Sequence, residues 1–348
     1  MDLTQRLSNH FTMINSRLKT FSGIIKSLLL TRDCHYRDFA EYIKNNATLE
    51  SKVKSIARFL LQNPILNNEY HNFIRHYIPN KKYIISIDRT IWEFGNHIRN
   101  ILVLAVSYDN IALPIIFKII PYKGACTAND QIEIINQYIS IYGSQNILAV
   151  TADREFDNKN FINHLSKLNI NYAVRLRKIT RVTDNNGQKT RIEHLNKQKL
   201  INYKTSLYDK KAVLNHISLG NSKYLSIISA KYCNVLDIYK RRWDIETAFK
   251  GCKTSGFKME NCKLRNPKRL ITFMKCIFIA YAIALKIGEK ENKITPIKTK
   301  SSLGCKVYSL LKYGLQIIKE AYINSSTKIL RLILYDAIPN KQNKNFVR

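Results

Sequence analysis

The stretch that decides the fold is a set of three apolar runs: YIISID at residues 83–88, ILVLAVSYD at 101–109 and IALPIIFKII at 111–120. All three runs are rich in β-branched residues, and only short polar links separate them. Such runs are typical of strands, and consecutive strands with short links pair antiparallel. Because the runs are apolar at both alternating positions, we predict a meander that is buried on both faces.

Downstream of this meander the pattern alternates between helix and strand. TANDQIEIINQYISIYG (127–143) predicts a helix, with Thr127 as N-cap, Asp130 three residues on and Gly143 at the end. NILAVTAD (146–153) and YAVRL (172–176) predict strands, and the segment 158–169 between them predicts an amphipathic helix. This order of elements is that of a ribonuclease-H-like mixed sheet flanked by helices. Many α/β folds share fragments of it, so the order alone does not decide the fold.

The rest of the chain suggests three further regions around a core at 81–178 and 235–290 that contains this mixed sheet. Residues 1–80 are predicted to form an all-helical N-terminal region, since the segment 51–62 is amphipathic with a basic outer face. That face is either an ordinary solvated surface or a DNA contact, and the excess of basic residues favours DNA. Residues 179–234, with the turn signal DNNGQ at 184–188, predict a β-rich insertion before the last catalytic helix. Residues 291–348 predict a C-terminal helical region, with helices near 303–322 and 326–337.

The charge balance points to a polyanionic partner. The chain carries 57 Lys and Arg against 25 Asp and Glu, a formal net charge of +32, and nucleic acid is the usual partner of so basic a protein. The longest apolar run, Cys276 to Leu285, is too short to span a bilayer and predicts a buried helix. The N-terminus shows no secretion signal. We therefore expect no membrane association and a cytoplasmic location.

Other kinds of chemistry find little support in the sequence. The seven cysteines are scattered singly without a Cys-x-x-Cys pair, which indicates reduced thiols that serve mainly in packing. His71 and His76 are five residues apart, a poor spacing for a metal site on one helix face. No Gly-x-x-x-x-Gly-Lys-Ser/Thr motif occurs, which disfavours an ATP-driven motor.

Two acids stand where apolar strands end. Asp88 closes SID in the first strand, Asp153 closes TAD in the fourth, and an Arg follows each of them. An acid beside a buried strand is costly unless something compensates its charge, and a metal ion is a common compensation. The alternative is that each acid only caps a turn. Two such acids on neighbouring strands favour the metal site.

A third acid lies in YKRRWDIETAFKGCK, residues 239–253. Taken as one helix at 100° per residue, the stretch places Glu246 on an arc with one aromatic and three basic residues. These companions are Tyr239, Arg242, Lys250 and Lys253. Such a face suits a protein that holds a metal ion and DNA phosphates at one place. The alternative is an ordinary surface helix in which Glu246 pairs with Lys250.

The same stretch resembles the signature of the insertion sequence 4 family of DDE transposases, Tyr-x2-Arg-x3-Glu-x6-Lys. Tyr239, Arg242, Glu246 and Lys253 match it at every spacing. SIDRTIWEFGNHIRNILVLAV and TADREF resemble the family's blocks around the first and second Asp. The resemblance extends over residues 82–318.

The resemblance implies a site and an activity. Asp88, Asp153 and Glu246 would form the catalytic triad and hold two Mg²⁺ ions, with Mn²⁺ able to substitute, for two-metal phosphoryl transfer. Side chains implied to bind DNA are Tyr239, Arg242, Lys250 and Lys253, followed by Arg89, Arg154 and Trp92 as second-rank candidates. The enzyme would cut at the terminal inverted repeats of a prokaryotic insertion sequence. It would then join the 3′ ends to target DNA, as a homodimer that synapses both ends near the nucleoid.

Two other functions compete with this one. A ribonuclease-H-like nuclease would cleave DNA without joining it and would need no paired terminal repeats. A catalytically silent DNA-binding descendant would be expected to have lost one of the acids. The resemblance also implies that some relatives cut through a DNA hairpin, in which a Trp of the insertion stabilises a flipped base. Neither Trp92 nor Trp243 lies in the insertion, so Tyr203, Tyr208 or Tyr224 would have to stack on that base instead. Whether this protein uses a hairpin stays open.

Overall fold

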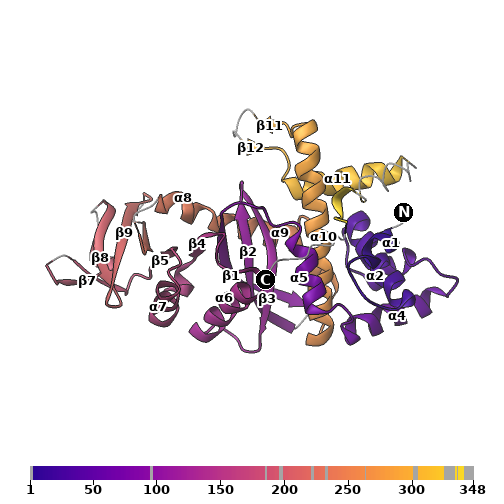
Figure 1. Cartoon of the computed structure of the whole chain (residues 1–348), viewed down its shortest axis with the longest axis horizontal. Helices are drawn as coiled ribbons and strands as arrows, with labels where there is room; N and C mark the ends of the chain where they lie inside the picture. Colours follow the sequence, from indigo (N-terminus) through magenta and orange to yellow (C-terminus); the bar gives the residue numbers. More distant parts are fainter. Residues whose placement is uncertain are drawn as a thin grey trace. The chain divides into compact units, whose positions relative to one another are not determined.

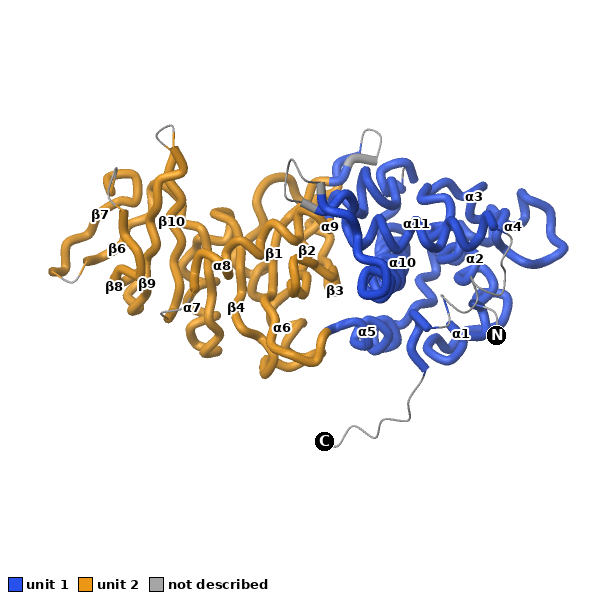
Figure 2. The backbone as a smooth tube through the Cα atoms, turned by 90° about the horizontal axis from the view of Figure 1, so that it is seen from above, with its two compact units in different colours: residues 1–78, 92–98, 249–348 blue, residues 79–91, 99–248 orange. Residues whose placement is uncertain are grey.

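The computed structural model describes residues 3–94, 97–184, 186–195, 199–220, 223–231, 234–262, 264–300, 305–324, 334 and 336–340. The chain forms two compact units (Figure 2). Unit 1 contains residues 1–78, 92–98 and 249–348, and unit 2 contains residues 79–91 and 99–248. Unit 1 is mainly helical, and unit 2 is built on the sheet.

Unit 2 contains the predicted meander and the two strands that follow it. The strands are β1 (Tyr83–Phe94), β2 (His97–Tyr108), β3 (Ile111–Ile120), β4 (Ile147–Ala152) and β5 (Tyr172–Arg175). They lie in the order β3-β2-β1-β4-β5 (Figure 1). β2 and β3 pair antiparallel, whereas β4 is parallel to β1 and β5 is parallel to β4. This topology is that of the ribonuclease-H-like fold, as the sequence predicted.

Two helices make the parallel crossovers, and the first of them begins and ends at the predicted caps. α6 (Ala128–Tyr142) begins at a capping box in which Thr127 and Asp130 each accept the other's backbone N–H. Gly143 ends this helix with φ of 78°, a conformation that glycine adopts without strain. α7 (Lys159–Lys167) begins at Asn158, whose side chain accepts the N–H of Phe161.

The β-rich segment continues the same sheet. Its strands are β6 (Arg181–Thr183), β7 (Lys189–Arg191), β8 (Leu200–Leu207), β9 (Lys210–Ser218) and β10 (Tyr224–Ser229). β10 pairs antiparallel with β5, so all ten strands form one sheet ending in β5-β10-β9-β8-β6-β7. The buried carboxylate of Asp157 ties this segment to the start of the second crossover, between β4 and α7, because it accepts hydrogen bonds from Arg177, Thr180 and Tyr208.

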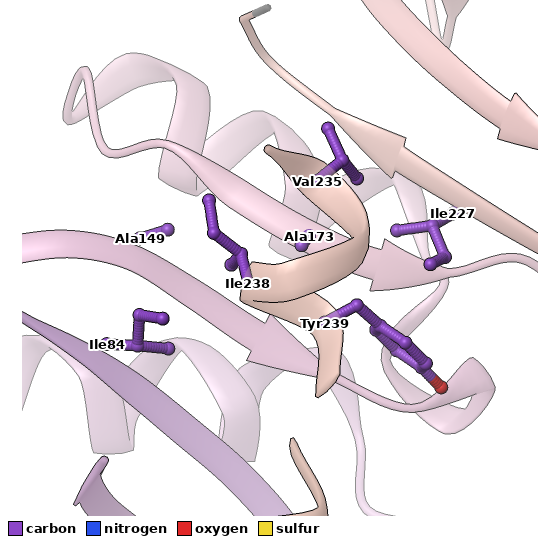
Figure 3. Packing of buried hydrophobic residues seen from close by; sticks show 7 residues of the cluster. All are labelled: Ile84, Ala149, Ala173, Ile227, Val235, Ile238 and Tyr239. Atoms are coloured by element: carbon purple, nitrogen blue, oxygen red, sulfur yellow. The ribbon is translucent and has the colours of Figure 1, made fainter. Parts of the chain in front are cut away.

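One face of this sheet is covered by a short helix, α8 (Val235–Lys240). Val235, Ile238 and Tyr239 of α8 pack on residues of four strands (Figure 3). The strand residues in this cluster are Ile84, Ala149, Ala173 and Ile227. Because residues two apart on a strand share a face, this packing marks the side of the sheet on which α8 and the helix after it lie.

Unit 1 is organised around one long apolar helix, α10 (Pro267–Ile294). The other helices are α1 (Leu3–Ser8), α2 (Asn15–Thr31), α3 (Tyr36–Glu41), α4 (Leu49–Gln62), α5 (Asn67–Arg75) and α11 (Leu310–Ile323), and β11 (Thr299–Lys300) pairs with β12 (Cys305–Lys306). α10 contacts α2, α4, α5 and α11. Its backbone lies close to that of α11, since a Cβ at Gly288 would be 2.0 Å from the carbonyl oxygen of Leu310. The helix expected over 326–337 lies largely outside the described residues.

α10 is long and apolar enough to cross a membrane by length and composition. However, 89% of its most apolar 18-residue window is buried inside the protein. Core helices of soluble proteins pass the same test, so the helix is weak evidence for a membrane span. The sequence predicted this segment as a buried helix, and the burial agrees with that prediction.

Candidate active site

The two strand-borne acids lie on the same face of the sheet. Ser86 of β1 and Thr151 of β4 are register partners, and Asp88 and Asp153 are each two residues further along. Alternation along a strand therefore places both carboxylates on the face that carries α8. Ser86 supports this placement, because its hydroxyl donates to the carbonyl oxygen of Arg241, directly after α8, at 3.3 Å.

The segment 239–253 is two helices rather than one. α8 ends at Lys240 and α9 begins at Arg242, so the single-helix interpretation is wrong at Arg241. The predicted apolar face holds, since Ile245 and Ala248 are buried. The opposite arc differs from the prediction: Tyr239 and Arg242 are also buried, at 4% and 6% exposure. These two side chains face the acids instead of open solvent.

Arg242 connects the helix to the strands. Its Nη1 lies 2.6 Å from Oε1 of Glu246 and 3.7 Å from Oδ2 of Asp88. The guanidinium also lies over the rings of Tyr239 and Trp243, at 5.6 and 5.4 Å from their centroids. Burial alone would lower the pKa of Arg242, but the neighbouring Tyr239 and the acids raise it overall. A permanent positive charge therefore lies among the three predicted catalytic carboxylates.

Asp153 has two partners of its own. The hydroxyl of Tyr239 donates to Oδ1 of Asp153 at 3.3 Å, and Nη1 of Arg175 lies 3.6 Å from the same oxygen. Burial raises the pKa of Tyr239, which keeps this hydroxyl a donor at neutral pH. Arg175 was missed by the sequence analysis. Its position at the end of a third apolar strand, in YAVRL, was the signal that could have identified it.

Asp88 is the most strongly perturbed of the three acids. Burial raises its pKa to about 6. The backbone N–H of Arg89 and the guanidinium of Arg242 oppose this shift, whereas Asp153 and Glu246 add to it. The three carboxylates therefore act on one another electrostatically although they come from three distant parts of the chain.

Comparison with known protein families now identifies the chain. A family model that describes the transposase DDE domain matches residues 79–283. This chain belongs to that family. The match contains both acid-bearing strands and α9, so DNA transposition is the broad function, and DDE domains in general depend on a divalent metal ion.

Two further comparisons add little to this transposase assignment. A cryo-EM structure of a piggyBac transposase synaptic complex with hairpin DNA is similar to this chain at a TM-score of 0.46 and 15% sequence identity. The similarity covers 95% of this chain and 78% of that chain. No curated protein matches the chain.

The remaining DNA-binding candidates of this transposase differ in their exposure and in the side chains that they contact. Arg154 and Lys250 are exposed. Lys253 lies 3.5 Å from Glu260 in unit 1, and Trp92 is fully buried, so its side chain is not open to DNA in this conformation. Arg89 is engaged with Glu155 and Asn100, at 2.8 Å from each. The structure therefore favours positioning over direct phosphate contact for Arg89.

The donor chemistry of the site suits a divalent cation, since Mg²⁺ prefers carboxylate oxygens. In the part of the chain that the structure describes, no group of three or more His, Cys, Asp or Glu side chains is arranged to hold a metal ion. The guanidinium of Arg242 bonds to Glu246 and lies near Asp88 in this conformation. Asp88 and Asp153 suit a metal ion by residue type and by their shared face of the sheet, but together with Glu246 they do not form such a group in this conformation.

Proposed function

We propose that this protein is a transposase of the insertion sequence 4 family. It would bind the terminal inverted repeats of its element, hydrolyse the strand at each end and join the 3′ ends to target DNA. One observation supports this most strongly: Arg242 of the family signature bonds to Glu246 of the same signature and lies 3.7 Å from Asp88 on β1. The spacing of Tyr239, Arg242, Glu246 and Lys253 is the reason for choosing this family among DDE transposases.

Asp88 and Asp153 would hold the metal from the strands, and Glu246 would hold it from α9. Two bound Mg²⁺ ions, or Mn²⁺ in their place, would activate the attacking oxygen and stabilise the leaving one. Arg242 would turn from Glu246 toward a DNA phosphate as the carboxylates take up the ions, because a phosphate offers the same charge-assisted hydrogen bonds. Tyr239 would keep Asp153 oriented through its hydrogen bond.

The exposed bases would position the DNA. Arg154 directly follows Asp153, and Lys250 lies one turn beyond Glu246 on α9, so both can contact phosphates. Lys253 would exchange Glu260 for a phosphate. We further propose that two copies synapse the two element ends and that the protein acts in the prokaryotic cytoplasm, at the nucleoid, without a membrane. The net charge of +32 suits such a location.

The direct test is cleavage of labelled DNA that carries the sequence flanking the gene, with Mg²⁺ or Mn²⁺. We expect nicking at the 3′ ends of the element, and its loss in Asp88→Ala, Asp153→Ala and Glu246→Ala. Asp237→Ala is the matched control, because this acid lies on α8 and its ion-pair partner is Lys240. Nicking that survives loss of any triad acid would contradict the assignment.

The same reaction separates the competing functions. Adding a supercoiled target plasmid should yield joined products from a transposase. A nuclease would cleave the ends and leave the plasmid unjoined, and a silent descendant would bind the ends without cutting them.

A further inference from the structure

The acids Asp88 and Asp153 lie just beyond the last rung of the β1–β4 ladder. The parallel register runs from Tyr83 to Ile87 on β1, and Ile87 pairs with Ala152 on β4. Asp88 and Asp153 each follow one of these paired residues. The pairing therefore fixes the backbone of both strands up to the acids. Beyond it β1 continues to Phe94 while β4 ends, so a side-chain interaction can set the spacing between β1 and the turn after β4.

An ion pair on the opposite face supplies that interaction. Arg89 follows Asp88, so it points to the other face of the sheet. Glu155 lies in the 3-10 turn after Asp153, where strand alternation no longer applies, and its side chain reaches Arg89 on that other face. Nε of Arg89 donates to both carboxylate oxygens of Glu155, at 2.8 and 3.0 Å. The two side chains are only 17% and 21% exposed, so solvent screens the pair weakly.

The pair is anchored on both sides. Nη1 of Arg89 donates to Asn100 of β2 at 2.8 Å, and Nδ2 of Asn100 donates to the carbonyl oxygen of Gly124 at 2.7 Å. Glu155 accepts the backbone N–H of Cys126 at 3.0 Å. β1, β2, the η1 turn after β4 (Arg154–Phe156) and the loop before α6 are thus joined through two charged side chains.

The charges of this pair are stable near neutral pH. The hydrogen bond to Glu155 raises the pKa of Arg89. Burial would raise the pKa of Glu155, but hydrogen bonds from Arg89 and Cys126 outweigh it and lower that pKa overall. The backbone N–H of Arg89 also donates to Oδ1 of Asp88 at 2.8 Å, so a shift of Arg89 moves the acid directly.

We propose that Arg89 and Glu155 form a positioning pair that sets the spacing of Asp88 and Asp153 from behind the sheet, before metal or DNA binds. The proposal rests on the proposed function, because it assumes that both acids hold the metal. In the proposed role both side chains act through the backbone that carries the acids, and neither has to touch substrate. Their effect is on the affinity for metal, and partners of this kind typically change metal affinity about 10- to 100-fold.

The test measures Mn²⁺ binding to the intact chain without DNA, by calorimetry or by the electron paramagnetic resonance signal of unbound Mn²⁺. Glu155→Gln and Arg89→Gln should each weaken Mn²⁺ binding about tenfold or more. The double variant should be no weaker than either single one, because the two side chains act as a unit. Arg89→Lys, which keeps the charge, should recover part of the loss.

Glu133→Gln is the matched control, since it removes an acid that also pairs with a base of unit 2, Lys118, away from the strand ends. It should bind Mn²⁺ like the wild type. Wild-type affinity in folded Glu155→Gln, or losses that add in the double variant, would overturn the positioning pair. If a single variant unfolds, as judged by circular dichroism, the Mn²⁺ affinity of Arg89→Lys alone tests the positioning pair.

Asp88→Asn and Asp153→Asn in the same assay separate the two proposals. Loss of Mn²⁺ binding in both supports the metal site, and the pair is then judged by its own variants. If both bind Mn²⁺ like the wild type, the acids do not hold the metal and the proposed function fails first.

Discussion

The strand-borne and helix-borne parts of the site are held in different ways. Asp88 and Asp153 extend from a hydrogen-bonded ladder, and an ion pair behind the sheet connects the residues that follow them. Glu246 lies on α9, which starts anew at Arg242 and is held by apolar packing of Ile245 and Ala248. The strand part is therefore rigid, whereas the position of Glu246 can change with a rotation of one helix or one side chain.

The same difference appears in the cations of the two parts. Arg89 donates hydrogen bonds to the acidic Glu155 and the neutral Asn100, and we expect it to keep both partners during the reaction. Arg242 bonds to Glu246 and lies near Asp88, and these are carboxylates that a metal ion would also need. The two arginines therefore differ in their proposed roles. Arg89 would set the spacing between Asp88 and Asp153, whereas Arg242 lies among the carboxylates where a metal ion would bind.

Changing the length of an acidic side chain should produce the largest difference in cleavage between the strand-borne and helix-borne parts. We expect Asp153→Glu to reduce cleavage by more than about 100-fold, because a rigid strand cannot absorb the extra methylene and the loss should exceed that of an outer partner. Glu246→Asp should reduce cleavage only about tenfold, because α9 can adjust its position. Single-turnover cleavage at saturating Mn²⁺ measures both, and equal losses would show that the two parts are equally rigid.

Removing Arg242 should lower stability in the helix-borne part. Arg242→Ala leaves Glu246 and the partly buried Asp88 without this cation. We expect the free energy of unfolding to fall by about 1–3 kcal/mol. Arg242→Lys should recover part of that cost. Thermal unfolding measures the change, and Lys240→Ala, which removes an exposed base nearby, should leave Tm almost unchanged.

The pH dependence of stability should have opposite signs for Asp88 and Glu155. The folded pKa of Asp88 is raised to about 6, so its charge costs stability above that pH, and the cost disappears as the pH falls toward 4. Asp88→Asn should therefore be more stable than the wild type at pH 7.5 but not at pH 4. The folded pKa of Glu155 is lowered, so Glu155→Gln should be less stable at pH 7.5 and match the wild type in acid.

Chemical unfolding at the two pH values checks both signs. If both amide variants shifted stability in the same direction, the contrast between the two faces of the sheet would fail. Metal binding should also weaken as the pH falls below about 6, because a proton and the ion then compete for Asp88.

The smallest effects should come from the bases at the end of α9. Lys253→Ala should leave Mn²⁺ binding unchanged and weaken binding to the element ends, and Lys250→Ala should weaken it more, since Lys253 must first give up Glu260. Each lost phosphate contact should reduce the salt dependence of binding by about one unit of slope. Fluorescence anisotropy at several salt concentrations measures this, and unchanged DNA affinity in both variants would contradict a phosphate role.

Much of the fold could be predicted because its signals are local. The β-branched runs of β1 to β3 and the Thr127 capping box with Gly143 each depend on residues within a few positions of one another. Both strand-borne acids could be found in the same way, although only Asp153 stands at a strand end: β1 runs on past Asp88 to Phe94, so that part of the prediction is wrong. The break at Arg241 could not, because the residues on both sides of it favour helix and only packing against the sheet separates them.

The sequence by itself determined the order of strands and helices, the strong positive charge, the two acids that close apolar segments and the Glu of the family signature. Only the tertiary structure decided which charges meet: Arg89 with Glu155, 66 positions apart, and Arg242 with Asp88, 154 positions apart. It also decided that the β-rich segment extends the main sheet through β10 and β5. The physical reason is that hydrogen bonds and helix periods are set by neighbours in the chain, whereas side-chain partners depend on strand register and on how helices pack across the sheet.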